Sequence, residues 1–263
     1  MTQTIDAAAF QQMVIHAAAA IRAEKQRIND LNVFPVPDGD TGTNMSLSIG
    51  AAAAEMKKQS FDTVGKAAQA TASALLRGAR GNSGVILSLL FRGFAKAVKD
   101  KDSIDGRDLA IALDFGVAAA YKAVMKPKEG TILTVARMMG EAAKQAVKQK
   151  KDVIETIDAM IEQGEKTLAQ TPELLPVLCS RKKQSPRKPS KDCGGRLVGF
   201  LNRQEGSGKL VDSEPSRSIG RLELMDQTNH DFTGIGLVIV FISLFIRILQ
   251  IRRSRIDARA LGE

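Results

Sequence analysis

The stretch NVFPVPDGDTGTNM, residues 32–45, lies between two Ala-rich segments whose composition is typical of α-helices. It contains two prolines and two glycines, which interrupt helices, so it predicts a bend between two helical segments. The carboxylates of Asp38 and Asp40 flank Gly39 at this bend. Two carboxylates are not needed to pack two helices together, so the bend is also a candidate functional site.

Helical periodicity continues on both sides of this bend. Before it, five apolar residues recur at the spacing of one helix face and predict a helix over about 5–28: Phe10, Met13, Val14, Ala17 and Ile21. After it, a helix is predicted to begin at Thr43, with Thr41 or Thr43 as its cap. Further helices are predicted over residues 61–78, 83–99, 105–124, 132–149 and 152–169.

Composition supports a helical domain and limits the classes of function. Of the 263 residues, 44% are hydrophobic, 4% are aromatic and none is Trp, which suits packed helices better than a sheet sandwich. The net charge of +9 is uneven, because residues 1–178 carry 22 Lys and Arg against 20 Asp and Glu. The basic excess therefore lies in residues 179–263, which lack interleaved aromatics, so no nucleic-acid binding is expected. The N-terminus lacks a secretory signal, which predicts a cytoplasmic location.

Asp38 and Asp40 have the spacing of a cation site. Carboxylates two residues apart can converge on one ion because Gly39 lets the backbone turn tightly between them. Magnesium prefers such oxygen ligands and keeps waters and phosphate oxygens at its other positions. An EF-hand is excluded, since position 12 of a loop counted from Asp38 is Ile49. The alternative is a solvated turn with a helix cap, because Asp, Gly, Thr and Asn are common turn residues.

Two later turns carry weaker signals. The run RGARGNSG places Gly81, Asn82 and Ser83 at the start of an apolar helix, where backbone N–H groups favour phosphate. The alternative is an interhelical turn in which Asn82 or Ser83 caps the helix. In EGTILTV, residues 129–135, Thr131 either caps a helix or contacts a nucleotide.

Four motifs taken in order resemble a known family. LNVFPVPDGDTGTNM, GARGNSGVILS, MKPKEGTILTV and TPELLPVL are similar to the N-terminal ATP-binding domain of the fatty acid kinase ATP-binding subunit. That domain belongs to the Dak2 family, which is related to the L subunit of dihydroxyacetone kinase (DhaL). The resemblance covers about residues 5–178 and implies an all-α fold, an up-and-down barrel of eight antiparallel helices. It also implies ATP at one end of the barrel, held through two Mg2+ ions by loop aspartates.

The resemblance also implies roles for individual residues. Asp38 and Asp40 would be the catalytic magnesium ligands, with Asn32 or Asp30 as the third ligand. The residues that would contact phosphate or nucleotide are Thr41, Gly42, Thr43, Asn44, Gly81, Asn82, Ser83 and Thr131. An Asp–small–Gly–Gly element opens the family's last helix; here it matches residues 192–203 and would place Asp192 and Gly194 beside the nucleotide.

Residues 179–263 depart from the family pattern and are predicted to form an irregular tail. Residues 179–191 are basic and rich in Pro and Ser, which is typical of a linker. Residues 232–251 are apolar and long enough to span a bilayer; the alternatives are an unselected sequence or a stray core helix. The family's later domains are not recognised, which fits a truncated or frame-shifted reading of a longer gene, with a natural short variant as the alternative.

The function implied by the resemblance is ATP-dependent phosphoryl transfer. The acceptor would be a fatty acid carboxylate presented by a separate lipid-binding, acyl-carrying partner protein. Such transfer depends on alignment and charge neutralisation, and the Pro-x-Pro run of the first motif predicts a stiff loop that holds its carboxylates in place. The alternatives are a dihydroxyacetone (glycerone) kinase subunit of the L type and a non-catalytic nucleotide-binding remnant.

Overall fold

The computed structural model describes residues 4–32, 34 and 36–175. This part of the chain forms eight helices, and its only strand-like feature is an isolated antiparallel bridge between Ile5 and Ile104. The helices are α1 (Ala7–Ala23), α2 (Lys25–Asp30), α3 (Thr41–Lys58), α4 (Val64–Gly78), α5 (Gly81–Ala97), α6 (Gly106–Ala123), α7 (Ile132–Lys148) and α8 (Val153–Leu174). The predicted all-α class is confirmed.

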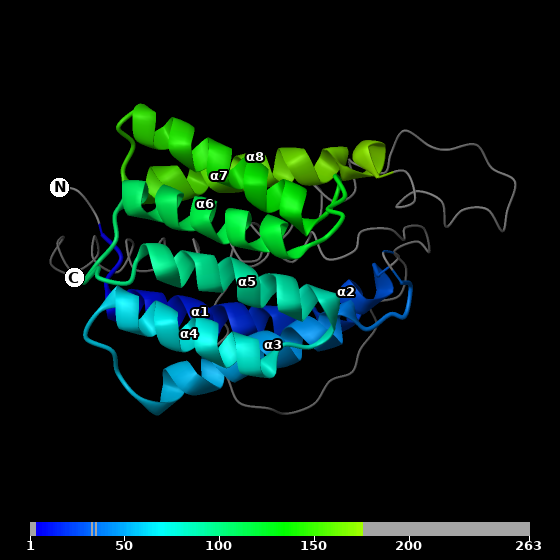
Figure 1. Cartoon of the computed structure of the whole chain (residues 1–263), viewed down its shortest axis with the longest axis horizontal. Coiled ribbons are helices and arrows are strands. Elements are labelled where there is room, and N and C mark those ends of the chain that lie inside the picture. The colour runs from blue at the N-terminus through cyan, green and yellow to red at the C-terminus, as the bar shows by residue number, and fades with distance from the viewer. Residues whose placement is uncertain (1–3, 33, 35, 176–263) are drawn as a thin grey trace, which may run out of the picture.

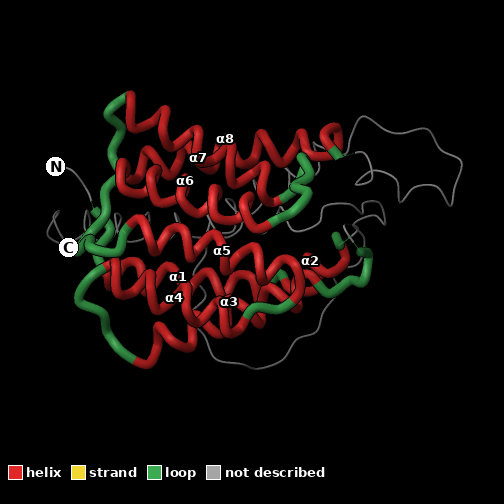
Figure 2. Tube along the Cα trace, in the orientation of Figure 1, coloured by secondary structure: helices red, strands yellow, loops and turns green. Residues whose placement is uncertain are grey.

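The helices run up and down, so that each long helix returns beside the one before it (Figure 1). From α3 to α8, every helix packs on the next in sequence, and α1 packs on α3 and α4. The connecting loops therefore gather at two opposite ends of the molecule (Figure 2). One end, on the right in Figure 1, holds the α2–α3 loop, the α4–α5 turn and the α6–α7 loop, which contain the three sequence motifs.

One hydrophobic core joins the helices and fixes this arrangement. Its largest fully buried side chains come from most of the helices: Phe10, Met13, Ile21, Met45, Ile49, Met56, Leu75, Met139, Ile157 and Leu168. Alanine fills many of the remaining core positions, which lets neighbouring helices approach closely. The periodic apolar positions of the sequence thus form the face that each helix buries.

Most helix boundaries lie within three residues of the sequence-based prediction, and three differences have structural consequences. The helix predicted over 5–28 is divided at Glu24, whose φ of −93° and ψ of 6° separate α1 from α2. Helix α3 begins at Thr41 rather than Thr43, with Asp40 in the N-cap position. Helix α8 continues past 169 to Leu174 although it contains Pro172.

The extension of α8 has a local explanation. Proline lacks an N–H, so Pro172 leaves the carbonyl of Leu168 without its usual helical partner. The hydroxyl of Thr171 donates to that oxygen at 2.7 Å. The helix therefore continues through the proline with this carbonyl satisfied.

The predicted last helix at 192–203, the basic run 179–191 and the apolar run 232–251 lie outside the described residues. Among the helices that the structure does describe, none combines the length and the apolar character needed to cross a bilayer.

Candidate functional site

A cavity of about 510 Å³ opens at the end of the molecule where the three motif loops meet. Thr41 reaches it from the start of α3, Asn82 and Ser83 from the start of α5, and Thr131 from the residue before α7. These four residues are separated by up to 90 positions in sequence, and all four were expected to contact nucleotide. The remaining lining residues are Phe34, Val85, Ile86, Leu89, Ala123, Val124, Met125, Lys126, Lys128, Ile132 and Leu133.

The other expected contact residues that the structure describes do not line the cavity, and two of them are glycines at close contacts between elements. Gly42 is buried against α2, where a Cβ would overlap the carbonyl oxygen of Lys25. Gly81 adopts a φ of +58°, and a Cβ there would lie 2.5 Å from Nδ2 of Asn44. These glycines therefore allow α3 to approach both α2 and the start of α5. Asp192 and Gly194 are outside the described residues.

A hydrogen bond also fastens the α4–α5 turn to α3. The backbone N–H of Arg80 donates to Oγ of Ser48 at 3.0 Å, and that hydroxyl donates to the carbonyl of Asn44 at 2.7 Å. Ser48 is fully buried. The glycine-rich start of α5 is thus held at a fixed place beside the start of α3.

The start of α3 is capped from a distance by Asn29, a residue that the sequence analysis missed. Its Oδ1 accepts from the N–H of Thr43 at 3.0 Å, and its Nδ2 donates to Oγ1 of Thr43 at 3.1 Å. The predicted cap, Thr41 or Thr43, is therefore wrong. Asp40 occupies the N-cap position, but its side chain makes no capping hydrogen bond. Its carboxylate is exposed and makes no hydrogen bond to the helix start, so it is free for a cation or for solvent.

The α2–α3 loop brings Asn32 to the carboxylates. Asp38 and Asp40 are exposed, whereas Asn32 is only 3% exposed and donates through Nδ2 to Oδ1 of Asp38 at 2.6 Å. Because the amide nitrogen must face the carboxylate, the amide oxygen faces the other way, and it is buried without a partner in the described chain. Asp30 is exposed and instead accepts from Gln26 at 2.9 Å. Of the two candidates for a third ligand, the structure brings Asn32 to Asp38.

This donor set fits a hard cation. Carboxylate oxygens are ligands that magnesium prefers, with water and phosphate completing its shell, and both aspartates are exposed. Oδ1 of Asn32 faces away from Asp38, so in this orientation Asn32 positions a carboxylate and does not itself complete the ligand set. Among the residues that the structure describes, no group of three His, Cys, Asp or Glu side chains is arranged for a metal. A cation at this site would therefore depend on ligand oxygens as well as on the aspartates.

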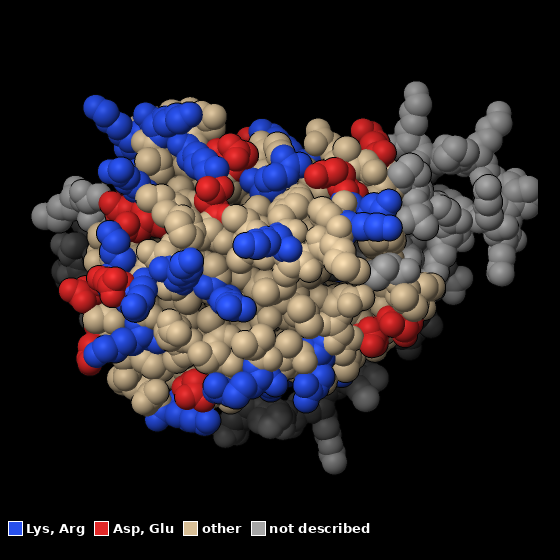
Figure 3. Space-filling model, in the orientation of Figure 1, with Lys and Arg blue, Asp and Glu red and all other residues tan. Residues whose placement is uncertain are grey.

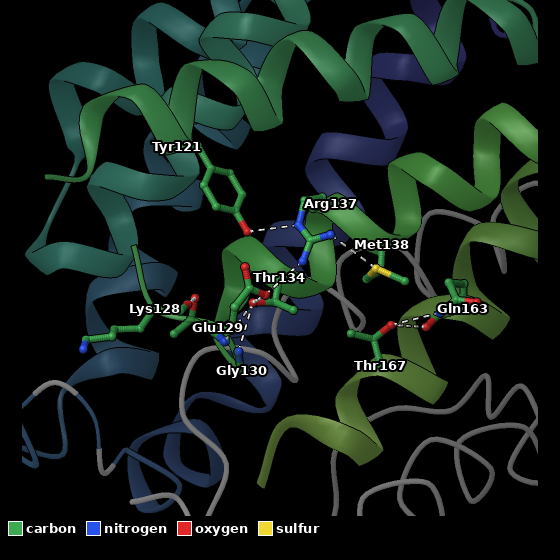
Figure 4. Close-up of polar contacts among 10 residues, drawn as sticks. Tyr121, Lys128, Glu129, Gly130, Thr134, Arg137, Met138, Gln163 and Thr167 are labelled. Atoms are coloured by element: carbon green, nitrogen blue, oxygen red, sulfur yellow. Dashed lines mark hydrogen bonds and ion pairs between the residues drawn. The ribbon is translucent and has the colours of Figure 1, made fainter. Parts of the chain in front are cut away.

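The α6–α7 loop is held by hydrogen bonds around Thr134 (Figure 4). Oγ1 of Thr134 accepts from the N–H of Gly130 at 3.0 Å and donates to Oε2 of Glu129 at 2.8 Å. Thr131 is the N-cap residue of α7, as one interpretation of EGTILTV predicted, and its hydroxyl donates to the carbonyl of Lys128 at 2.8 Å. Thr131 also lines the cavity, so the cap and the contact with a ligand do not exclude one another.

Arg137 ties this loop to α6 and α7. Its Nη2 lies 2.9 Å from Oε2 of Glu129, and its Nε donates to the hydroxyl of Tyr121 at 3.4 Å. The hydrogen bond with Tyr121, followed by contacts with Glu129, raises the pKa of the Arg137 guanidinium above its usual range. Arg137 is therefore cationic throughout the accessible pH range, and the pairing with Glu129 persists wherever that carboxylate is ionised.

Charged side chains of both signs are interspersed over the face of the molecule drawn in Figure 3, with uncharged surface between them. Ion pairs between described residues include Lys144 with Asp114 and Lys101 with Asp108. Hydrogen bonds to those carboxylates raise the pKa of both lysines. The described part of this face thus presents a mixed field rather than a field of one sign.

Comparison with known proteins gives consistent results. The family model of the DAK2 domain matches residues 35–201. Protein YloV of Bacillus subtilis (strain 168) is 48% identical over 176 residues, which cover 67% of this chain and 32% of the relative. An uncharacterized protein of Staphylococcus epidermidis is 43% identical over 240 residues, and one of Staphylococcus saprophyticus is 38% identical over 240, each covering 89% of this chain and 42% of the relative.

The chain spans less than half the length of these curated relatives. Matches that cover 89% of it also extend beyond the first 178 of its 263 residues. The family model alone covers more than half of the chain and includes the α4–α5 turn, the α6–α7 loop and the α2–α3 loop from residue 35 onward. The chain therefore belongs to the DAK2 domain family, whose domains are nucleotide-binding modules of the kinase type.

Proposed function

We propose that this domain binds ATP in the cavity between the three loops and supports transfer of its terminal phosphoryl group. The observation that carries the proposal is the meeting of Thr41, Asn82, Ser83 and Thr131 in one cavity. The carboxylate loop that contains Asp38 and Asp40 directly precedes Thr41. Polar groups for phosphate and carboxylates for a cation are thus contributed by adjacent elements, as phosphoryl transfer requires.

The cavity has separate regions for the two ends of a nucleotide. Aliphatic and aromatic side chains such as Phe34, Ile86 and Leu89 offer an apolar wall that suits a base. The start of α5, at Asn82 and Ser83, offers backbone N–H groups and the positive end of a 17-residue helix, which suit phosphate. The start of α5 would therefore hold the phosphates, while Ile86 and Leu89 of the same helix, together with Phe34 of the α2–α3 loop, would contact the base.

Asp38 and Asp40 would hold magnesium at the phosphate end, and Asn32 would position the carboxylate of Asp38. Bound magnesium supplies neutralisation of the charge on the polyphosphate. The chain's own contribution is to keep these oxygens in place: Asn32 donates to Asp38 at 2.6 Å, and Asn29 fixes the start of the helix that follows Asp40. Such preorganisation lowers the cost of binding and orienting the donor.

The acceptor in this proposal is a fatty acid carboxylate presented by a separate lipid-binding protein. This choice of acceptor is supported by the sequence of the first motif, VFPVPDGDTGTN, which resembles that of the fatty acid kinase subunit more than that of the dihydroxyacetone kinase subunit. The described domain would supply the activated donor, and the carrier protein would supply the aligned acceptor. Because the chain spans less than half of its relatives' length, the activity of a whole protein of this kind is also part of the proposal.

The test has two stages that use the full chain. Calorimetric titration with ATP in Mg2+ and in EDTA should show binding that depends on the metal. Labelled ATP is then supplied with a fatty-acid-loaded lipid-binding protein or with dihydroxyacetone, and the product is identified. Label on the fatty acid supports the proposal, whereas label on dihydroxyacetone would indicate the other kinase class. Binding without transfer to either acceptor would indicate a nucleotide-binding module only, and no ATP binding would overturn the proposal.

A further inference from the structure

Two lysines of the α6–α7 loop line the same cavity, although neither was among the residues expected to bind nucleotide. Lys126 and Lys128 contribute to the wall that also contains Thr131. Other exposed lysines pair with carboxylates, as Lys166 does with Glu162 at 2.6 Å and Lys66 with Asp62 at 3.1 Å. Within the described residues, no ion pair involves the ammonium group of Lys126 or Lys128.

The nearest carboxylate in sequence, Glu129, is held away from these lysines. Its Oε2 lies 2.9 Å from Nη2 of Arg137 and accepts from Oγ1 of Thr134 at 2.8 Å. Figure 4 shows the side chain of Glu129 directed toward Arg137 and Tyr121, while the side chain of Lys128 extends to the other side of the loop. The acid of this loop, Glu129, is bound by Arg137 and Thr134 of α7, whereas its two lysines line the cavity and form no ion pair among the described residues.

We propose that Lys126 and Lys128 bind the polyphosphate of a nucleoside triphosphate, and that Arg137 is a positioning residue that keeps Glu129 from competing for them. The inference rests on the proposed function and adds a cationic wall to that site. A cation beside a phosphate forms charge-assisted hydrogen bonds, which are stronger than neutral ones. A free Glu129 carboxylate next to Lys128 would instead pair with the lysine and repel the ligand. Arg137 prevents this by neutralising Glu129.

The first test separates phosphate contacts from general effects of charge. Lys126→Met, Lys128→Met and the double variant are titrated with Mg-ATP and with AMP, using the full chain. Lys148→Met is the matched control, because it removes an exposed lysine at the opposite end of α7. We expect each single variant to weaken ATP binding about tenfold, as for loss of one hydrogen bond to a charged group. AMP binding should change far less, and the control should bind both nucleotides as the wild type does.

The second test addresses the positioning role of Arg137. Arg137→Met removes the cation paired with Glu129 and leaves this carboxylate bound by Thr134 alone. The variant should weaken ATP binding by about threefold to fivefold, the effect of one exposed charge. Adding Glu129→Gln removes that carboxylate, so the double variant should recover most of the affinity. A merely structural role for Arg137 predicts no recovery, because the double variant still lacks the tie to α7. Thermal melting of both variants checks that each remains folded.

The outcomes distinguish this inference from the proposed function. If the wild type binds Mg-ATP but the lysine variants bind it equally well, the inference is overturned and the nucleotide site stands. Equal losses for ATP and AMP would show that the lysines shape the cavity rather than contact phosphate, which also overturns it. A double variant no better than Arg137→Met would remove the positioning role. If the wild type binds no nucleotide, both the site and the inference fail.

Discussion

The side-chain amide of Asn32 joins a buried position to the exposed carboxylate of Asp38. Its nitrogen donates to Oδ1 of Asp38 at 2.6 Å, while its oxygen is buried without a partner in the described chain. A buried acceptor left unpaired costs about 1–3 kcal/mol. A cation bound by Asp38 would supply the missing partner only if the amide reversed, because the oxygen now faces away from that carboxylate. Changing the Asn32 side chain should therefore alter both the stability of the loop and its response to a cation.

Asn32→Asp should make the stability of the domain depend on magnesium. The new carboxylate removes the hydrogen bond to Asp38 and places two like charges together, which is unfavourable without a cation. In EDTA we expect a loss of about 1–3 kcal/mol, or several degrees in Tm for a domain of this size. Added Mg2+ should raise the Tm of the variant more than that of the wild type. Sodium at equal ionic strength is the control, and a Tm indifferent to Mg2+ would argue against a cation at this loop.

Asp38→Asn and Asp40→Asn should each abolish magnesium-dependent ATP binding while leaving helix content unchanged. Both carboxylates are exposed and neither supports the core or caps α3, so their loss removes charge without removing packing. Calorimetry with Mg-ATP and far-ultraviolet circular dichroism measure the two effects. Asp62→Asn is the matched control, because Asp62 is an exposed aspartate before α4, at the far end of the bundle. Wild-type affinity in either loop variant would remove the metal-site interpretation.

Gly81→Ala should destabilise the domain and disturb the cavity. Alanine at a φ of +58° costs about 1–2 kcal/mol, and its methyl group would lie 2.5 Å from Nδ2 of Asn44, so Asn44 must also shift. Gly50→Ala is the control: Gly50 lies within α3, and a Cβ there meets nothing within 4 Å. That change should stabilise the helix by about 0.5–1 kcal/mol. Chemical denaturation measures the free energy of unfolding of both variants, which should fall for Gly81→Ala and rise for Gly50→Ala.

Helical periodicity was sufficient to predict the class of the fold, since each helix buries the apolar stripe that its sequence displays. The details that failed depend on contacts between distant residues. The division at Glu24 and the capping of Thr43 by Asn29 are set by the packing of α2 against the start of α3. The continuation of α8 through Pro172 depends on a single hydroxyl of Thr171, which no propensity rule anticipates.

The candidate site was predicted through its motifs rather than through its geometry. Asn82 and Thr131 were proposed because each lies in a turn with unusual composition, and Thr41 was proposed through the resemblance to the family; the fold brings all three to one cavity. Lys126 and Lys128 were missed although both stand in the run MKPKEGT. Two lysines on either side of a proline are common in loops, so this run offered no reason to select them. The structure shows that Glu129, the neighbouring acid, is paired with Arg137 and not with these lysines.

Asn29→Ala should weaken both the fold and the nucleotide site, whereas loss of a comparable cap elsewhere should weaken only the fold. The variant loses the acceptor for the N–H of Thr43 and the donor to its hydroxyl, at the helix start that follows Asp40 and carries Thr41 into the cavity. Thr63→Ala is the matched control, because Thr63 caps α4 by accepting from the N–H of Lys66 at 3.2 Å, at the opposite end of the bundle.

Each cap substitution should cost about 1 kcal/mol of unfolding free energy. Only Asn29→Ala should also reduce the affinity for Mg-ATP, because only its helix start positions residues that face the ligand. Denaturant titration measures the first effect and calorimetry the second, on the same protein preparations. Equal stability losses with equal nucleotide affinities would mean that the start of α3 does not contribute to binding. The cavity would then have to bind its ligand through α5 and the α6–α7 loop alone, and the carboxylates before α3 would have no part in it.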